Sequence, residues 1–350
     1  MSLTIDYIKK IDIEITNKCN ARCPGCIRTV DGDTHPFLKK NISEWSLEDF
    51  SKLLPADIIS GKEFIFGGTV DDPFMNRNIV PITEYILGNG GKIELRTNTG
   101  ANTKETFARM GQLSKETGRL LVVFSVDGFK NTNHLYRVNV NWDKIVENMT
   151  AYTTAKGQCE WQYLVFDHNY DDIENAKKLA QQLGIRFILR QNVRNNHSWV
   201  SKSKVKEEGK VVTKEFEVKT TEKFEHPETS TVTKYNHKVE ISKEEGNSIS
   251  CKMYHDRSVF VDWNYKVWPC CWFATENFEQ HEYFHMLIDE FGENWNSLRH
   301  HSWNEILSHD YYTRLLHESW NGQESDYYHT TCFKQCGDNA ARQTYKKQEI

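Results

Sequence analysis

The sequence predicts an α/β fold, an open barrel of six βα units followed by a smaller α+β part. Three observations lead to this prediction. Six short apolar runs alternate with amphipathic helix patterns up to residue 190. Strands that alternate with helices form right-handed βαβ units and therefore a parallel sheet. The composition then changes twice, to a Lys- and Glu-rich stretch after residue 194 and to a segment rich in aromatic residues, histidine and cysteine from residue 251.

These changes divide the chain into three predicted parts. Residues 1–194 should form the barrel core, 195–250 an insertion and 251–350 a C-terminal domain. The insertion shows no persistent apolar pattern, so we expect a solvent-exposed β-ribbon or a flexible segment there.

The individual elements follow from local patterns. The six strand-like runs are 11–15, 63–66, 92–96, 120–126, 161–166 and 187–190. Ser46 can cap a helix, and a helix after Asp171 should stop at Gly184, because glycine adopts the left-handed conformation that ends a helix. In the C-terminal part, residues 259–268 should form a hairpin around Asn264 that positions Cys270, followed by helical patterns at 303–307 and 311–316.

Composition excludes several classes of protein. A net charge of -5 and a pI near 6.3 give no electrostatic attraction to nucleic acid or to an anionic membrane. No apolar run reaches the roughly 18 residues of a membrane span, and residues 1–10 lack the apolar core of a secretory signal. We therefore expect a cytoplasmic protein that binds neither nucleic acid nor membrane. In that compartment nine cysteines indicate metal or redox chemistry rather than disulfides.

Three cysteines directly follow the first predicted strand. Cys19, Cys23 and Cys26 have the spacing C-x3-C-x2-C. Three thiolates can hold three corners of a four-iron cluster, which leaves the fourth iron open to a small molecule. The alternative is a structural zinc site completed by a histidine, for which His35 is the nearest candidate.

Polar residues also follow the other predicted strands. They lie at 67–73, 97–100, 125–128 and 167–169. In barrels of this kind the loops after the carboxyl ends of the strands build the active site. The same positions in an ordinary protein would be strand-to-helix turns.

The cysteine motif after a first strand, with the strand-end motifs in this order, resembles the radical S-adenosylmethionine (SAM) enzymes. The resemblance covers residues 11–194 and implies a partial (β/α)6 TIM-type barrel. It also implies a [4Fe-4S] cluster that binds SAM and cleaves it to a 5'-deoxyadenosyl radical. Within this core, residues 127–194 resemble a largely uncharacterised branch of the superfamily, which names no substrate.

The resemblance also implies which residues bind SAM: Gly68, Thr69, Asp72, Asn98, Ser125, Asp127 and Arg137. The segment 67–73 would receive the amino group, since an ammonium needs acceptors and a nearby anion. It departs from the family's compact Gly-Gly-Glu-Pro, because it is stretched and Asp71 stands where related chains often carry glycine. Short side chains at 98, 125 and 127 would bind the ribose and carboxylate, and Arg137 could pair with the carboxylate. A lone arginine is otherwise usually a surface residue.

A second set of cysteines lies in the C-terminal part. Cys251, Cys270, Cys332 and Cys336 resemble the twitch form of the SPASM extension, in which a hairpin and a helix hold an auxiliary [4Fe-4S] cluster. Four cysteines also suit tetrahedral zinc. Cys271 adjoins Cys270 and competes with it as the ligand, although the hairpin favours Cys270. The remaining Cys159 is expected to be a buried small apolar residue.

We therefore expect a radical SAM enzyme that abstracts a hydrogen atom from its substrate, with the auxiliary cluster assisting net oxidation or cross-linking. An external one-electron donor such as flavodoxin or ferredoxin would supply the reducing electron. His168, Asp167 and Tyr136 are candidates for proton removal. A small molecule is favoured over a peptide as substrate, because the first strand begins about ten residues from the start and leaves no room for an N-terminal peptide-recognition domain. The alternatives are a non-catalytic iron-sulfur protein for electron transfer and a zinc-binding module.

Overall fold

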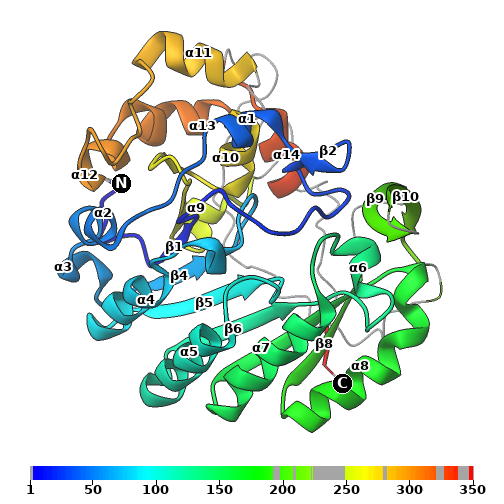
Figure 1. Ribbon diagram of the computed structural model, residues 1–350. Coiled ribbons are helices and arrows are strands. Elements are labelled where there is room, and N and C mark those ends of the chain that lie inside the picture. Colours follow the sequence, from blue (N-terminus) through cyan, green and yellow to red (C-terminus); the bar gives the residue numbers. More distant parts are fainter. Residues whose placement is uncertain are drawn as a thin grey trace.

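A nine-stranded sheet forms the centre of the molecule, in the order β12-β11-β1-β4-β5-β6-β7-β8-β13 (Figure 1). The computed structural model describes residues 3–191, 198–207, 210–221, 223, 249–278, 282–320, 327–337 and 347–349. Six strands match the predicted runs: β1 (Lys10–Ile13), β4 (Glu63–Phe66), β5 (Lys92–Thr97), β6 (Leu120–Ser125), β7 (Gln158–Val165) and β8 (Arg186–Gln191). Each pairs in parallel with the next in chain order. The predicted α/β fold with an open parallel sheet is therefore confirmed.

One face of the sheet is apolar and is covered by helices. Phe66 lies 6.5 Å from Phe50 of α2 (Leu47–Leu53), measured between ring centroids. Phe124 lies between α5 (Lys104–Thr117) and α7 (Trp142–Thr154). Burying each such ring stabilises the fold by roughly 1.5–3 kcal/mol. Helices α4 (Ile79–Gly88) and α8 (Ile173–Leu183) complete this layer (Figure 1).

The opposite face of the sheet is polar. Successive side chains of a strand point to opposite faces. The residues that alternate with the apolar ones therefore share this second face, among them Asp12 and Glu14 at β1, and Glu94 and Arg96 on β5. The helices α2, α4, α5, α7 and α8 therefore lie on the side of the sheet opposite to this charged face.

The predicted helix signals have the expected geometry. The Ser46 hydroxyl accepts a hydrogen bond from the backbone N–H of Asp49 at 3.0 Å and caps α2. Gly184 ends α8 in the left-handed conformation, with φ 67°. A 3-10 turn, η2 (Asp167–Asp172), precedes α8, which itself begins at Ile173.

The C-terminal part continues the same sheet. Strand β11 (Ser258–Val261) pairs in parallel with β1, and β12 (Val267–Trp268) pairs antiparallel with β11, so the predicted hairpin is present. The Asp262 carboxylate holds its turn by accepting from the backbone of Lys266 and from the Trp268 indole. Strand β13 (Lys347–Glu349) pairs antiparallel with β8 at the far edge.

The remaining elements are short. They are β2 (Thr29–Val30), β3 (Asp33–Thr34), α1 (Pro36–Lys40), α3 (Ala56–Ile59), η1 (Pro73–Met75), α6 (Asn133–Tyr136), α9 (Lys252–His255), α10 (Cys271–Phe278), α11 (Glu282–Phe291), α12 (Trp303–Leu307), η3 (Tyr311–Leu315), α13 (Leu316–Glu318) and α14 (Thr330–Cys336). The helical patterns predicted at 303–307 and 311–316 therefore coincide with helices, and η3 is a π-helix.

Part of the insertion forms a two-stranded antiparallel ribbon. Strands β9 (Ser198–Glu207) and β10 (Lys210–Lys219) pair along their whole length. The indole of Trp199 lies so close to Gly25 that a Cβ built there would be 2.5 Å from the ring. Phe216 of β10 meets His168 of η2 with ring centroids 5.4 Å apart. The ribbon therefore joins the loops that follow β1 and β7. Residues 224–248 of the predicted insertion lie outside the described residues.

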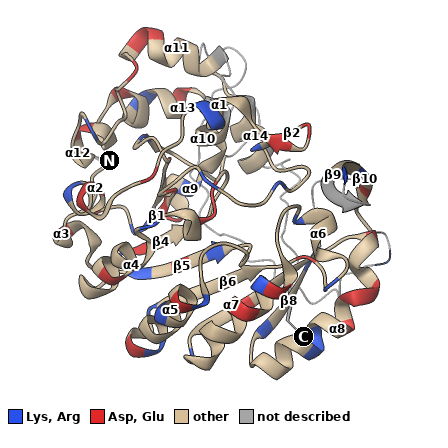
Figure 2. Cartoon of the chain, in the orientation of Figure 1, with Lys and Arg blue, Asp and Glu red and all other residues tan. Residues whose placement is uncertain are grey.

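Charges of both signs are interspersed along the outer helices α5, α7 and α8 (Figure 2). Among the helices in the described ranges, none combines the length and the apolar character needed to cross a membrane.

Candidate active site

The loops after β1, β4, β5 and β6 meet at the carboxyl edge of the sheet. The backbone N–H of Asp72, after β4, donates to the carbonyl of Lys18 in the loop after β1 at 2.9 Å. Arg22 of that loop likewise donates its N–H to Val138, after β6, at 3.0 Å. Parallel strands bring these loops to one edge.

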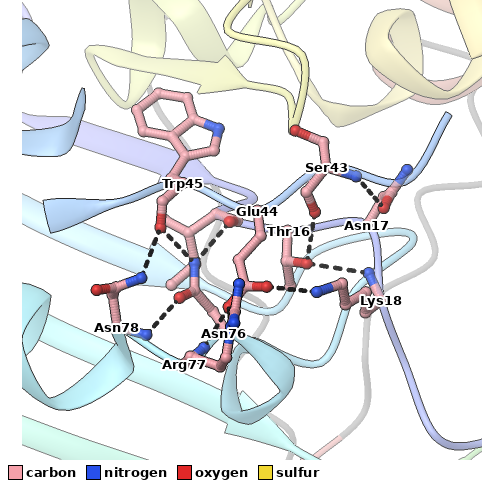
Figure 3. A network of polar contacts seen from close by, with 10 residues as sticks. Thr16, Asn17, Lys18, Ser43, Glu44, Trp45, Asn76, Arg77 and Asn78 are labelled. Carbon is pink, nitrogen blue, oxygen red and sulfur yellow. Dashed lines mark hydrogen bonds and ion pairs between the residues drawn. The ribbon is translucent and has the colours of Figure 1, made fainter. Parts of the chain in front are cut away.

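A polar network fixes the chain just before the first cysteine (Figure 3). The Thr16 hydroxyl donates to the carbonyl of Ser43 at 2.8 Å, and the ammonium of Lys18 pairs with Glu44. The Asn76 amide donates to the carbonyls of Ile15 and Trp45. The starting point of the cysteine loop is therefore tied to the segments 43–45 and 76–78.

Each of the three N-terminal cysteines contacts a polar group of another loop. The amide of Asn98 donates to Cys19 Sγ at 3.6 Å, and Arg137 Nη1 donates to Cys23 Sγ at 3.7 Å. The thiol of Cys26 approaches the carbonyl of Thr69 at 4.0 Å. The predicted residues of three different strand ends thus converge on the cysteine loop.

Cys23 is buried, whereas Cys19 and Cys26 are half-buried, and the charges of the thiols act on one another. Burial raises the pKa of Cys23 to about 11 against the opposing charge of Arg137, and Cys26 contributes to the rise. Burial also raises the pKa of Cys19 far above its ordinary value, with Cys23 among the contributing charges. Buried thiols of this kind hold their protons until a metal replaces them.

The donor set fits an iron-sulfur cluster by its chemistry. Among the residues that the structure describes, no group of three or more His, Cys, Asp and Glu is placed around a point that could hold a metal ion. Cysteine thiolates are the ligands that hold iron-sulfur clusters in proteins. His35, the alternative zinc ligand, accepts the N–H of Phe37 through Nδ1 at 3.1 Å and caps α1.

The loop after β4 depends on two glycines and on a buried glutamate. Gly67 has φ 89°, and a Cβ there would lie 2.3 Å from the carbonyl oxygen of Arg96. Glu14, 2 % exposed, accepts hydrogen bonds from the N–H groups of Thr69 and Val70 at 3.0 and 2.8 Å and from the Thr69 hydroxyl. A Cβ on Gly68 would lie 3.1 Å from Phe260 of β11. Sequence reasoning missed Glu14, although a glutamate directly after a buried strand was a visible signal.

Asp71 and Asp72 have different surroundings. Both oxygens of the Asp72 carboxylate accept hydrogen bonds. The donors are Thr97 Oγ1, the N–H of Asn98 at 2.8 Å and the N–H of Phe74 at 3.1 Å. Neither carboxylate oxygen of Asp71 completes a hydrogen bond within the described part of the chain, although the N–H of Gly68 favours its charged form. Burial, and then the charges of Glu14 and Asp72, raise the pKa of Asp71 well above its usual range.

The polar residues after β5 and β6 use many of their hydrogen-bonding atoms on partners within the protein. Asn98, 4 % exposed, also donates to Asn20 of the cysteine loop at 2.8 Å. Arg137 directs Nε and Nη2 at one oxygen of Asp127, each at 2.7 Å. The other Asp127 oxygen accepts the N–H of Leu164 at 2.7 Å. Ser125 ends β6 with a partly exposed side chain.

The C-terminal cysteines form a second group. The pKa of Cys251 is raised by burial and then by Cys336. The pKa of Cys270 is raised by burial and then by the adjacent Cys271, with smaller contributions from Cys251 and Cys332. Helix α14 carries Cys332 and Cys336, and Ser250 donates its N–H to the carbonyl of Cys336 at 2.9 Å. The charges of Cys336 and Cys332 therefore act on Cys251 and Cys270, which belong to other chain segments.

Cys271 has a different environment from Cys270. After burial, the groups that act on its pKa are Lys252, Asp12 and Glu14, which belong to α9 and to the polar face of the sheet. Its surroundings therefore favour Cys270 as the member of the second group. Cys159 is half-buried on β7 and packs against the hydrophobic core.

The three proton-transfer candidates lie beside the loop after β7. Tyr136 is 6 % exposed and packs on Phe166 at 4.5 Å between centroids. The His168 ring also stacks on Phe166, with ring centroids 5.5 Å apart. Neither ring nitrogen of His168 has a hydrogen-bond partner among the described residues. Burial lowers the pKa of His168 to about 4, so its imidazole is neutral at pH 7. Asp167 is exposed.

Comparison with known proteins gave structural matches only. No protein-family model matches the chain, and no curated protein matches it. Streptococcus suis SuiB bound to the precursor peptide SuiA is similar over 77% of this chain and 61% of its own, at 12% identity and a TM-score of 0.48. SuiB bound to S-adenosylmethionine is similar over 81% and 68%, at 13% identity and 0.46. Native anSMEcpe with bound AdoMet is similar over 51% and 50%, at 15% identity and 0.37. This chain therefore spans about three fifths of SuiB in its peptide complex.

Proposed function

We propose that this chain is a radical SAM enzyme in which Cys19, Cys23 and Cys26 hold a [4Fe-4S] cluster. The observation that carries the proposal is the convergence of these thiols with Thr69, Asn98 and Arg137 at the carboxyl edge of the parallel sheet. That edge is where the active sites of such barrels lie. Three cysteine ligands leave one iron available for SAM.

When bound, the cluster and SAM supply reductive cleavage of the sulfonium and abstraction of a hydrogen atom from the substrate. The protein must bind the cofactor, orient it and exclude water. Glu14 holds the loop after β4 through its hydrogen bonds to Thr69 and Val70. The desolvated thiol of Cys19 and the buried Asn98 keep water away from the proposed cluster.

Asp71 is the acidic residue best placed to receive the SAM ammonium. Its buried carboxyl has no completed hydrogen bond among the described residues, whereas the carboxylate of Asp72 is saturated. An acid whose pKa is raised by burial gains most from an approaching cation. Thr69 supports the same role, since its carbonyl faces the cysteine loop. The side chain of Ser125 is proposed to contact the ribose or carboxylate of SAM.

Cys251, Cys270, Cys332 and Cys336 are proposed to hold an auxiliary [4Fe-4S] cluster. Such a cluster, saturated by protein thiolates, can accept the second electron of a net oxidation or cross-linking reaction. The substrate is proposed to be a small polar molecule. The charged face of the sheet, which presents Asp12 and Arg96 near Lys252, supports a polar ligand.

Anaerobic reconstitution tests the proposal. Protein loaded with iron and sulfide, then given dithionite and SAM, should form 5'-deoxyadenosine even without substrate. Cys23→Ala should abolish this product, and Cys159→Ala, a matched change outside both groups, should not. Protein that takes up iron but forms no 5'-deoxyadenosine would instead support the iron-sulfur electron-transfer alternative.

Metal analysis tests the auxiliary site and the zinc alternative. About eight irons per chain are expected from two clusters, and about four should remain in a Cys251→Ala variant. Zinc retained in place of iron by anaerobically purified protein would contradict both cluster assignments. For Asp71, an Asp71→Asn variant should bind SAM more weakly at unchanged iron content.

A further inference from the structure

We infer that Arg137 is a positioning residue that raises the reduction potential of the proposed SAM-binding cluster through its contact with Cys23. The inference rests on the proposed function and assigns Arg137 a role other than contact with the SAM carboxylate.

The guanidinium of Arg137 is held in one orientation. Nε and Nη2 both lie 2.7 Å from the same carboxylate oxygen of Asp127, and Nη1 lies 3.7 Å from Cys23 Sγ. The Tyr136 ring packs against the same guanidinium, 5.4 Å from its centroid. All three nitrogens of the fork are therefore directed at partners within the protein.

Asp127 is itself fixed. It is 1 % exposed, its second oxygen accepts the N–H of Leu164, and its backbone N–H donates to Asn133. The carboxylate binds the edge of the guanidinium that faces away from the sulfur. The Asp127–Arg137 pair therefore presents its positive end to Cys23.

This arrangement should act on the potential of a cluster held by Cys23. Reduction adds a negative charge to a cluster, and a cationic donor to a ligating sulfur stabilises that charge. The effect is weakly screened here, because Cys23 is 6 % exposed and Asp127 is buried. Asn98 makes a neutral contact of the same kind to Cys19 at 3.6 Å.

Arg22 provides a matched control. It belongs to the same cysteine loop, but its side chain is 39% exposed and pairs with Asp33 at 3.6 Å. Arg22→Gln also removes one positive charge, in this case from the cysteine loop itself, and it removes an ion pair with Asp33 instead of a contact to a cysteine sulfur.

The test is an anaerobic redox titration of the reconstituted full chain without SAM, monitored by electron paramagnetic resonance. The signal that responds to later SAM addition identifies the relevant cluster. We expect Arg137→Gln to shift its midpoint to more negative values, by at least a tenfold change in the reduction equilibrium, or about 59 mV for one electron. Arg137→Lys should shift it in the same direction, because one ammonium cannot reach both Asp127 and Cys23. Arg22→Gln should leave it unchanged.

The outcomes separate this inference from the proposed function. A wild-type chain that assembles no cluster refutes the function itself. A cluster whose midpoint is the same in wild type, Arg137→Gln and Arg137→Lys refutes only the inference, as does an equal shift in Arg22→Gln. If Arg137→Gln does not fold because Asp127 is left buried without its cation, Arg137→Lys alone decides. If Arg137→Gln weakens SAM binding and leaves the midpoint potential unchanged, Arg137 binds the SAM carboxylate and the inference is refuted.

Discussion

Glu14 gives the most quantitative prediction of the structure, because its burial couples stability to pH. Its carboxylate lies under the loop after β4 and accepts from the N–H groups of Thr69 and Val70. Burial, opposed by the hydrogen bonds from that loop, raises the pKa of Glu14 from 4.5 to about 7. The folded chain therefore binds a proton at this site over a pH range in which the unfolded chain has lost it.

The sign follows from this difference. A carboxyl with a raised pKa in the folded state favours folding at low pH, and its contribution is lost as the pH rises above the unfolded pKa. The full shift corresponds to about 3 kcal/mol, most of which should be lost between pH 5 and pH 8. Glu14→Gln removes the titrating group and keeps an oxygen that can accept from the loop.

The measurement is urea unfolding of wild type and Glu14→Gln at pH 5 and pH 8. The stability of the variant relative to wild type should increase by roughly 2–3 kcal/mol between the two pH values, whatever the difference at pH 5. Glu63→Gln is the control, because it makes the same Glu-to-Gln change at a half-exposed position on the neighbouring strand β4. A relative stability that is constant with pH, or that falls, would refute the account of Glu14 as a buried acid.

Three further changes test other contacts. Gly67→Ala should destabilise the chain by more than about 1 kcal/mol in urea unfolding, because Gly67 has a positive φ and a Cβ there would clash with the backbone. Gly61→Ala is the control: Gly61 also has a positive φ, but a Cβ there meets no other atom, so the loss of stability should be smaller. Trp199→Ala should speed proteolysis within the ribbon, because the indole packs on the cysteine loop, while Val200→Ala, at an exposed position, should not. His168→Phe should stabilise the chain by about 1 kcal/mol, because it keeps a stacked ring and removes two buried nitrogens without partners among the described residues. A destabilised His168→Phe would mean that the imidazole makes a favourable polar contact.

Local patterns predicted the parallel sheet well, because each βα unit carries its own signals. The apolar runs, the Ser46 cap and the Gly184 stop all depend on neighbours within a few residues. The pairing of β11 with β1 depends on segments about 250 residues apart in the sequence, and no local pattern specifies it. For the same reason the sequence predicted a β-ribbon or a flexible segment after residue 194, without its contact to Gly25.

In the candidate site, the sequence predicts the cysteine motif but not the roles of the acidic residues around it. The cysteine spacing predicts chemistry because it is a property of one short segment, but the roles of acidic residues depend on what surrounds each carboxylate. Asp71 and Asp72 are adjacent in sequence, and only the fold distinguishes them: Asp72 accepts hydrogen bonds from Thr97 and Asn98, whereas the Asp71 oxygens have no hydrogen-bond partner among the described residues. Arg137 is a similar case, since its contact with Asp127 uses the fork that the motif alone assigns to SAM. In this candidate site the sequence therefore indicates which residues could bring the chemistry, and the hydrogen bonds of the fold decide which of their polar atoms remain without a partner among the described residues.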